Sequence, residues 1–146
     1  MQTASPFPVA RILAVDDCPV QRVLISRHLE VADYLVVTVE TGQEALSAAR
    51  KGRFDVVVLD VNIPGMGGPE IGRALRADPA TSDLLIVMHS TESEAAVRER
   101  FSAFDAFVSK PATPRQLAER INEVIAKRRR QSMKLPDPLD EHLVFG

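Results

Sequence analysis

The amino-acid sequence predicts one α/β domain whose parallel sheet is covered by helices on both faces. Three observations indicate this fold. Short apolar runs alternate with segments of helical periodicity along most of the chain. The runs are continuously apolar, which is typical of parallel strands buried on both faces. The chain has 146 residues, of which 45% are hydrophobic, so it suits one domain with a substantial core.

The first strand and helix are expected at the start of this pattern. The apolar run 12–15 predicts a buried strand that ends at Asp16. Pro19 follows near the start of the first helix, where a missing N–H costs little because it has no partner in the first turn. The helix itself is predicted by the 3.6-residue spacing of Val20, Val23, Leu24 and either His28 or Leu29.

The second unit is defined by the residues at the ends of its helix. Residues 35–39 are mostly β-branched and predict the second strand. Thr41 is a suitable N-cap for the next helix, and Glu44 three residues later completes a capping box. Gly52 is expected to end this helix, because glycine readily takes the conformations found just past a helix C-terminus.

Three more units complete the pattern. The apolar runs 54–59, 84–88 and 105–109 predict the third, fourth and fifth strands. The third helix is expected after a loop rich in Gly and Pro, the fourth at about 93–102, and the fifth from Thr113 to about 129. Each connection between parallel strands should be a right-handed crossover.

Composition excludes several classes of protein. The longest apolar run, 84–88, is far shorter than the roughly 20 residues of a membrane-spanning helix. A single cysteine, Cys18, cannot form an internal disulfide, which favours a reducing compartment and a cytoplasmic location. The formal net charge of −2 gives no basic footprint for nucleic acid, and the basic run 127–130 fits a solvated helix end.

Polar side chains follow four of the predicted strands, at the point where each strand ends. They are Asp16 and Asp17, Asp60, Ser90 and Lys110. The carboxyl ends of parallel strands meet at one edge of the sheet, where ligands bind in open α/β folds, so these residues should converge. Three neighbouring carboxylates repel one another, and a divalent cation together with Lys110 would relieve that repulsion. Hard oxygen ligands favour Mg²⁺, and no His/Cys cluster competes for a softer metal.

The motifs at these strand ends resemble those of a known family, the receiver domain of bacterial two-component response regulators. The matching segments are Val15-Asp16-Asp17, Leu59-Asp60-Val61-Asn62-Ile63-Pro64-Gly65-Met66-Gly67-Gly68, Ser90-Thr91 and Lys110-Pro111. The resemblance covers about residues 9–129 and is nearest to stand-alone regulators of the chemotaxis type. It implies a flavodoxin-like, doubly wound (βα)5 fold with a five-stranded parallel sheet in the order 2-1-3-4-5.

The resemblance also implies a chemistry for these residues. Asp60 would accept a phosphoryl group from the phosphohistidine of a histidine kinase or histidine phosphotransfer protein. Lys110 and the Ser90 hydroxyl would hold the phosphoryl oxygens. Mg²⁺, or Mn²⁺, would be bound by Asp16, Asp17, Asp60 and the backbone carbonyl of Asn62.

A conformational switch is implied as well. Ser90 would move toward the phosphoryl group while Phe107 turns inward, which would change a surface that binds a downstream protein. The side chains of Asn62, Thr91 and Glu92 would influence the access of water to the site. We therefore expect a signalling protein that does not insert into a membrane and is not an enzyme acting on other molecules.

The expected organisation is an N-terminal extension at 1–8, the receiver domain at 9–130 and a C-terminal tail at 131–146. This tail is either a disordered end or a docking segment. Three alternatives remain: a scaffold of the same fold that is independent of phosphorylation, a fragment of a longer regulator, and a Mg²⁺-dependent aspartyl phosphatase of the haloacid dehalogenase type. The last alternative expects a second Asp where this chain has Asn62.

Overall fold

The computed structural model describes residues 10–133. Five strands and five helices alternate along the chain. The strands are β1 (Arg11–Val15), β2 (Leu35–Val39), β3 (Val56–Asp60), β4 (Leu85–Ser90) and β5 (Ala106–Ser109). The helices are α1 (Pro19–Val31), α2 (Gly42–Lys51), α3 (Gly68–Ala77), α4 (Glu94–Arg100) and α5 (Pro114–Met133).

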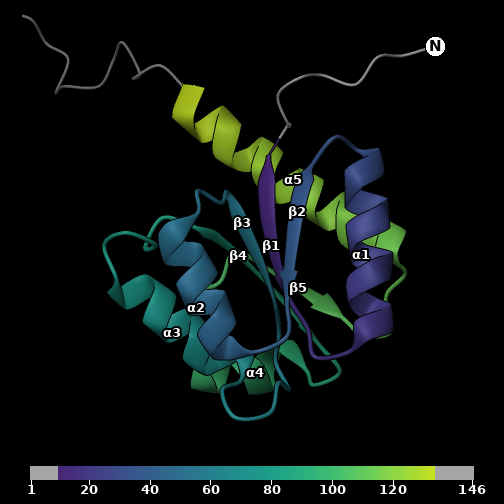
Figure 1. Cartoon of the computed structure of the whole chain (residues 1–146). Helices are drawn as coiled ribbons and strands as arrows, with labels where there is room; N and C mark the ends of the chain where they lie inside the picture. The colour runs from purple at the N-terminus through teal and green to yellow at the C-terminus, as the bar shows by residue number, and fades with distance from the viewer. Residues whose placement is uncertain (1–9, 134–146) are drawn as a thin grey trace, which may run out of the picture.

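All five strands form one parallel sheet in the order β2-β1-β3-β4-β5. Helices α1 and α5 cover one face, and α2, α3 and α4 cover the other (Figure 1). Each face has its own apolar cluster, and the central strands contribute alternate side chains to the two clusters. The fold class and the strand order expected from the sequence are therefore confirmed.

The ends of α2 form as the sequence predicts. The Thr41 hydroxyl accepts a hydrogen bond from the Glu44 N–H at 3.1 Å and donates one to the Glu44 carboxylate at 3.0 Å. Gly52 follows the last helical residue, and its N–H donates to the Ala48 carbonyl. These contacts satisfy backbone groups that a helix end leaves without intrahelical partners.

Helix α1 forms where the sequence predicts it, but most of the apolar residues that mark its spacing are exposed. Val20 and Val23 are 65% and 49% exposed, and Leu24 is also classed as exposed. The residues that α1 buries are Ile25 and Leu29, which pack with the core cluster on the α5 face. Apolar residues occur on more than one side of this helix, so spacing alone did not determine which side faces the sheet.

Helix α5 is longer than expected, since it runs to Met133 and not to about residue 129. It therefore crosses the expected domain boundary at residue 130. Near its end, the Arg128 guanidinium donates to the Asp83 carbonyl at 2.9 Å, which holds this part of the helix against the protein body. The extension at 1–8 and tail residues 134–146 lie outside the described residues. Over residues 10–133, no helix is long and apolar enough to cross a membrane.

Candidate functional site

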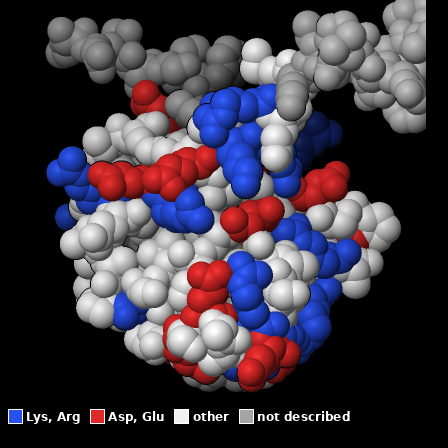
Figure 2. All heavy atoms as spheres, turned by 180° about the vertical axis from the view of Figure 1, so that it is seen from behind, with Lys and Arg blue, Asp and Glu red and all other residues white. Residues whose placement is uncertain are grey.

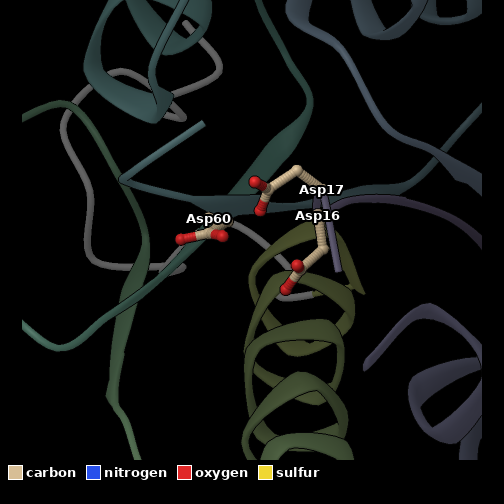
Figure 3. Close-up of side chains that lie close together, drawn as sticks. All are labelled: Asp16, Asp17 and Asp60. Carbon is tan, nitrogen blue, oxygen red and sulfur yellow. The ribbon is translucent and has the colours of Figure 1, made fainter. Parts of the chain in front are cut away.

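Three carboxylates gather at the carboxyl edge of the sheet, as predicted. Asp16 and Asp17 directly follow β1, and Asp60 is the last residue of β3. One carboxylate oxygen from each residue lies within 4.8 Å of the others (Figure 3). Asp16 and Asp60 are buried, whereas Asp17 is exposed. The cluster is thus anchored inside the protein and open to solvent on the side of Asp17.

Lys110 joins this cluster from the end of β5. Its Nζ atom lies 3.2 Å from Oδ1 of Asp60 and 3.6 Å from Oδ2 of Asp16. The Lys110 N–H donates to the Ser90 carbonyl at 2.7 Å, which continues the pairing of β4 and β5 past the last strand residue. Because the lysine side chain is mostly buried, its charge acts on both carboxylates with little screening by solvent.

Burial makes Asp16 an unusual carboxylate. Oδ1 of Asp16 accepts the Cys18 N–H at 2.9 Å, but the buried Oδ2 has no hydrogen-bond partner in the described part of the chain. Desolvation raises the pKa of Asp16 above 3.8, opposed by the Cys18 hydrogen bond and by Lys110, and the charges of Asp60 and Asp17 add to the rise. A buried oxygen without a partner, beside two further carboxylates, fits a hard divalent cation.

The loop after β3 is shaped by short backbone contacts. The Asn62 N–H donates to Oδ1 of Asp60 at 3.2 Å, which helps to orient the carboxylate. A side-chain carbon at Gly67 would lie 2.7 Å from the Val61 carbonyl oxygen, so only glycine fits there without a shift. Gly65 has a φ of 85°, in the left-handed region that glycine occupies at little cost. The glycines of this motif therefore keep the loop close to the end of β3.

The expected switch residues, Ser90 and Phe107, lie on the neighbouring strands β4 and β5. Ser90 is fully buried, and its Oγ accepts the Glu92 N–H at 2.9 Å. Phe107 is partly buried, with its ring centre 6.0 Å from that of Phe104. Thr91 is exposed at the start of the β4–α4 loop. Ser90 and Thr91 therefore lie at the carboxyl end of β4, whereas Phe107 lies two residues before the end of β5.

His89 lies next to Ser90 on β4 and is not among the site residues expected from the sequence. It is 3% exposed and pairs in register with Asp60. Both ring nitrogens are buried without a hydrogen-bond partner in residues 10–133. Burial, and to a smaller extent the charge of Lys110, lower its pKa from 6.5 to about 4, and Asp60 opposes both effects. The sequence signal for a buried polar residue here is a histidine between the apolar run 84–88 and Ser90.

Basic residues gather elsewhere, at the opposite edge of the sheet. A cavity of about 430 Å³ lies between the second half of α5 and the starts of β4 and β5. Its basic lining residues are Arg120, Lys127, Arg128 and Arg130, and its acidic ones are Asp105 and Glu123. Figure 2 shows Lys and Arg interspersed with Asp and Glu over this side of the molecule. The mixed charge fits a solvated surface and not a strongly basic binding patch.

Comparison with known proteins matches this geometry to one family. The sequence profile of the "Response regulator receiver domain" matches residues 12–122. Protein PilH of Pseudomonas aeruginosa is 32% identical over 121 residues, which cover 81% of this chain and 99% of PilH. Sensor protein GacS of Pseudomonas syringae is 37% identical over 114 residues, which cover 75% of this chain and 13% of GacS. The chain therefore spans only a small part of some relatives and nearly the whole of another.

Solved structures agree with the sequence match. Chemotaxis response regulator CheY4 of Vibrio cholerae is 35% identical, with a TM-score of 0.74 over 79% of this chain and 98% of that one. Response regulator TrrA of Thermotoga maritima, determined in complex with Mg(2+)-BeF, is 31% identical, with a TM-score of 0.71 over 80% of this chain and 99% of that one. These matches favour the receiver interpretation over the phosphatase alternative. With its acidic cluster at the edge of a 2-1-3-4-5 sheet, the chain belongs to the response regulator receiver domain family.

Proposed function

We propose that this receiver domain accepts a phosphoryl group on Asp60 from a phosphohistidine and then presents an altered surface to a downstream protein. One observation carries the proposal: three carboxylates and Lys110 converge at one edge of the sheet, with Asp60 3.2 Å from the Lys110 ammonium. The phosphodonor would be a histidine kinase or histidine phosphotransfer protein. The expected cytoplasmic location stays a prediction.

The proposed reaction is a displacement at phosphorus. An oxygen of the Asp60 carboxylate bonds to phosphorus while the phosphorus–nitrogen bond of the donor breaks. The donor imidazole keeps the electron pair and is then protonated. Lys110 would offset the charge on the phosphoryl oxygens, and a lysine held beside both carboxylates needs little rearrangement to do so.

A divalent cation fits the site. Asp16, Asp17 and Asp60 would hold Mg²⁺ or Mn²⁺ with the backbone carbonyl of Asn62, and the partnerless Oδ2 of Asp16 supports this assignment. When bound, the cation would neutralise charge on the phosphoryl oxygens. The acyl phosphate would later be hydrolysed by water, which regenerates the carboxylate and releases inorganic phosphate.

The proposed switch links Ser90 to Phe107. In the present structure the Ser90 hydroxyl accepts the Glu92 N–H, so moving it toward a phosphoryl oxygen would release the start of the β4–α4 loop. Phe107 would then turn inward and lose its contact with Phe104. The surface that changes would comprise α4, β5 and α5. The side chains of Asn62, Thr91 and Glu92 would influence how fast water reaches the acyl phosphate.

The test is phosphorylation by acetyl phosphate with Mg²⁺, followed by intact-mass measurement. We expect one added phosphoryl group in the wild type and none in Asp60→Asn. Asp33→Asn is the matched control, because Asp33 is exposed, lies outside the cluster and has a φ of 66° that asparagine tolerates. An unmodified wild type, or equal modification of Asp60→Asn, would contradict the proposal and favour the phosphorylation-independent scaffold.

A further inference from the structure

His89 is a buried imidazole at the carboxyl end of β4 that the proposed function does not use. It lies in register between Asp60 of β3 and Val108 of β5. Residues paired in register on parallel strands point to the same face of the sheet, so the imidazole and the Asp60 carboxylate share a face. Val108 on this face belongs to the core cluster that packs with α1 and α5.

Both ring nitrogens of His89 lack a hydrogen-bond partner in the described residues. Buried polar atoms are hydrogen-bonded in the great majority of cases, and an unmet one is costly. Leucine would occupy a similar volume on this apolar face without that cost. The presence of an imidazole therefore needs a reason other than packing.

The ring offers an acceptor at neutral pH. Burial and the neighbouring Lys110 charge lower the pKa of His89 to about 4, so the ring is neutral and carries one donor and one acceptor nitrogen. Lys110 and Asp60 are the two charged groups that act on it. Of these two groups, only the Lys110 ammonium carries hydrogen-bond donors.

Lys110 has a donor to spare for such an acceptor. A lysine ammonium carries three N–H donors. One of them can reach Oδ1 of Asp60, which lies 3.2 Å from Nζ, whereas Oδ2 of Asp16 at 3.6 Å is beyond hydrogen-bond distance. A further N–H of Lys110 is therefore left for another acceptor, and His89 lies on the same face of the sheet as Asp60.

We propose that His89 is a positioning residue for phosphoryl transfer, and that its acceptor nitrogen takes one further N–H of Lys110 through one bridging water, which leaves another N–H for a phosphoryl oxygen. The inference rests on the proposed function. The added hydrogen bond would restrict the ammonium to one position beside Asp60. A donor fixed in this way stabilises developing charge without reorganising during the reaction.

The first test compares phosphorylation rates with acetyl phosphate at saturating Mg²⁺. His89→Leu removes both nitrogens, and we expect a rate about ten-fold lower, the factor for roughly one lost hydrogen bond to a charged group. His89→Gln keeps an amide acceptor and should stay within about three-fold of wild type by the same reasoning. Met88→Leu is the matched control, since Met88 is equally buried on β4 but faces the other core cluster.

A double-mutant cycle separates positioning from structure. In a Lys110→Met background, His89→Leu should cause no further slowing, because His89 acts through the Lys110 ammonium. Mg²⁺ affinity measured by calorimetry should be the same in wild type and His89→Leu. If His89→Leu slows both backgrounds by the same factor, or if its rate equals that of wild type, the inference is overturned.

An NMR measurement tests the hydrogen bond without relying on a folded His89 variant. The ¹⁵N shifts of the His89 ring should identify one acceptor nitrogen, and its shift should change in Lys110→Met. An unchanged shift would contradict the inference even if phosphorylation occurs. Failure of the proposed function is a different outcome, namely a wild-type protein that is not modified at Asp60.

Discussion

The buried imidazole of His89 makes the stability of this domain depend on pH. Its pKa is about 4 in the folded protein and 6.5 in the reference state of an exposed histidine. The unfolded chain therefore binds a proton more tightly than the folded one, and protonation favours unfolding. The contribution of a neutral His89 is complete above the unfolded pKa and is lost as the pH falls from 6.5 toward 4.

The size of the effect follows from the two pKa values. Linkage gives a loss of about 2 kcal/mol at pH 5 and about 3 kcal/mol at pH 4, relative to neutral pH. This is a large share of the roughly 5–15 kcal/mol that stabilises a typical domain. Asp16 acts in the opposite direction, because its raised pKa lets the folded state keep a proton more tightly. The effect of His89 must therefore be measured as the difference in free energy of unfolding between wild type and a His89 variant.

The assay is urea unfolding of wild type and His89→Leu between about pH 7.5 and pH 4. As the pH falls over this range, the free energy of unfolding of His89→Leu should rise by about 3 kcal/mol relative to that of wild type. His28→Gln is the control, since it removes an exposed imidazole on α1 and leaves His89 in place, so this variant should keep the pH dependence that His89 confers. Parallel curves for wild type and His89→Leu would refute the reasoning.

Three further predictions use thermal or urea unfolding. Thr41→Ala should cost about 1 kcal/mol, because the Glu44 N–H loses its cap, and an unchanged midpoint would contradict this reading of the helix start. Gly72→Ala should destabilise the protein by roughly 1–2 kcal/mol, because the alanine Cβ would lie 2.6 Å from the Phe101 ring. This loss is expected although alanine favours helices more than glycine does. Adding Phe101→Leu to the Gly72→Ala variant should recover part of the lost stability. Asp16→Asn should raise the midpoint in metal-free protein and reduce the stabilisation that added Mg²⁺ provides, and a lower metal-free midpoint would refute the assigned cost of burying this carboxylate.

The elements and the edge at which the polar residues meet were predictable for a clear reason. Parallel strands place their carboxyl ends side by side, so residues distant in the chain converge once each strand end is identified. Asp16 and Lys110 are far apart in sequence, yet their charged atoms lie 3.6 Å apart. Local signals were equally informative at Thr41, where the capping contacts involve only neighbouring residues.

Features that depend on partners distant in sequence were harder to predict. The buried side of α1 is decided by how the helix packs on β2 and α5, and its many apolar residues gave no unique stripe. The last turns of α5 include a contact that is distant in sequence, between Arg128 and the Asp83 carbonyl. The burial of the His89 ring, without a hydrogen-bond partner among residues 10–133, results from the packing around β4, which only the assembled sheet defines.

The alternation of β4 divides the site into two parts. His89 lies on the face of Val87 with α1 and α5, whereas Ser90 lies on the face of Met88 with α2, α3 and α4. Phe107 pairs with Met88 on this second face. His89 therefore shares a face of the sheet with the charged Asp60, whereas the proposed repacking of Phe107 takes place on the other face. The consecutive residues His89 and Ser90 connect the two faces. A change at His89 should consequently alter the proposed phosphorylation rate while leaving the Phe107 contacts intact.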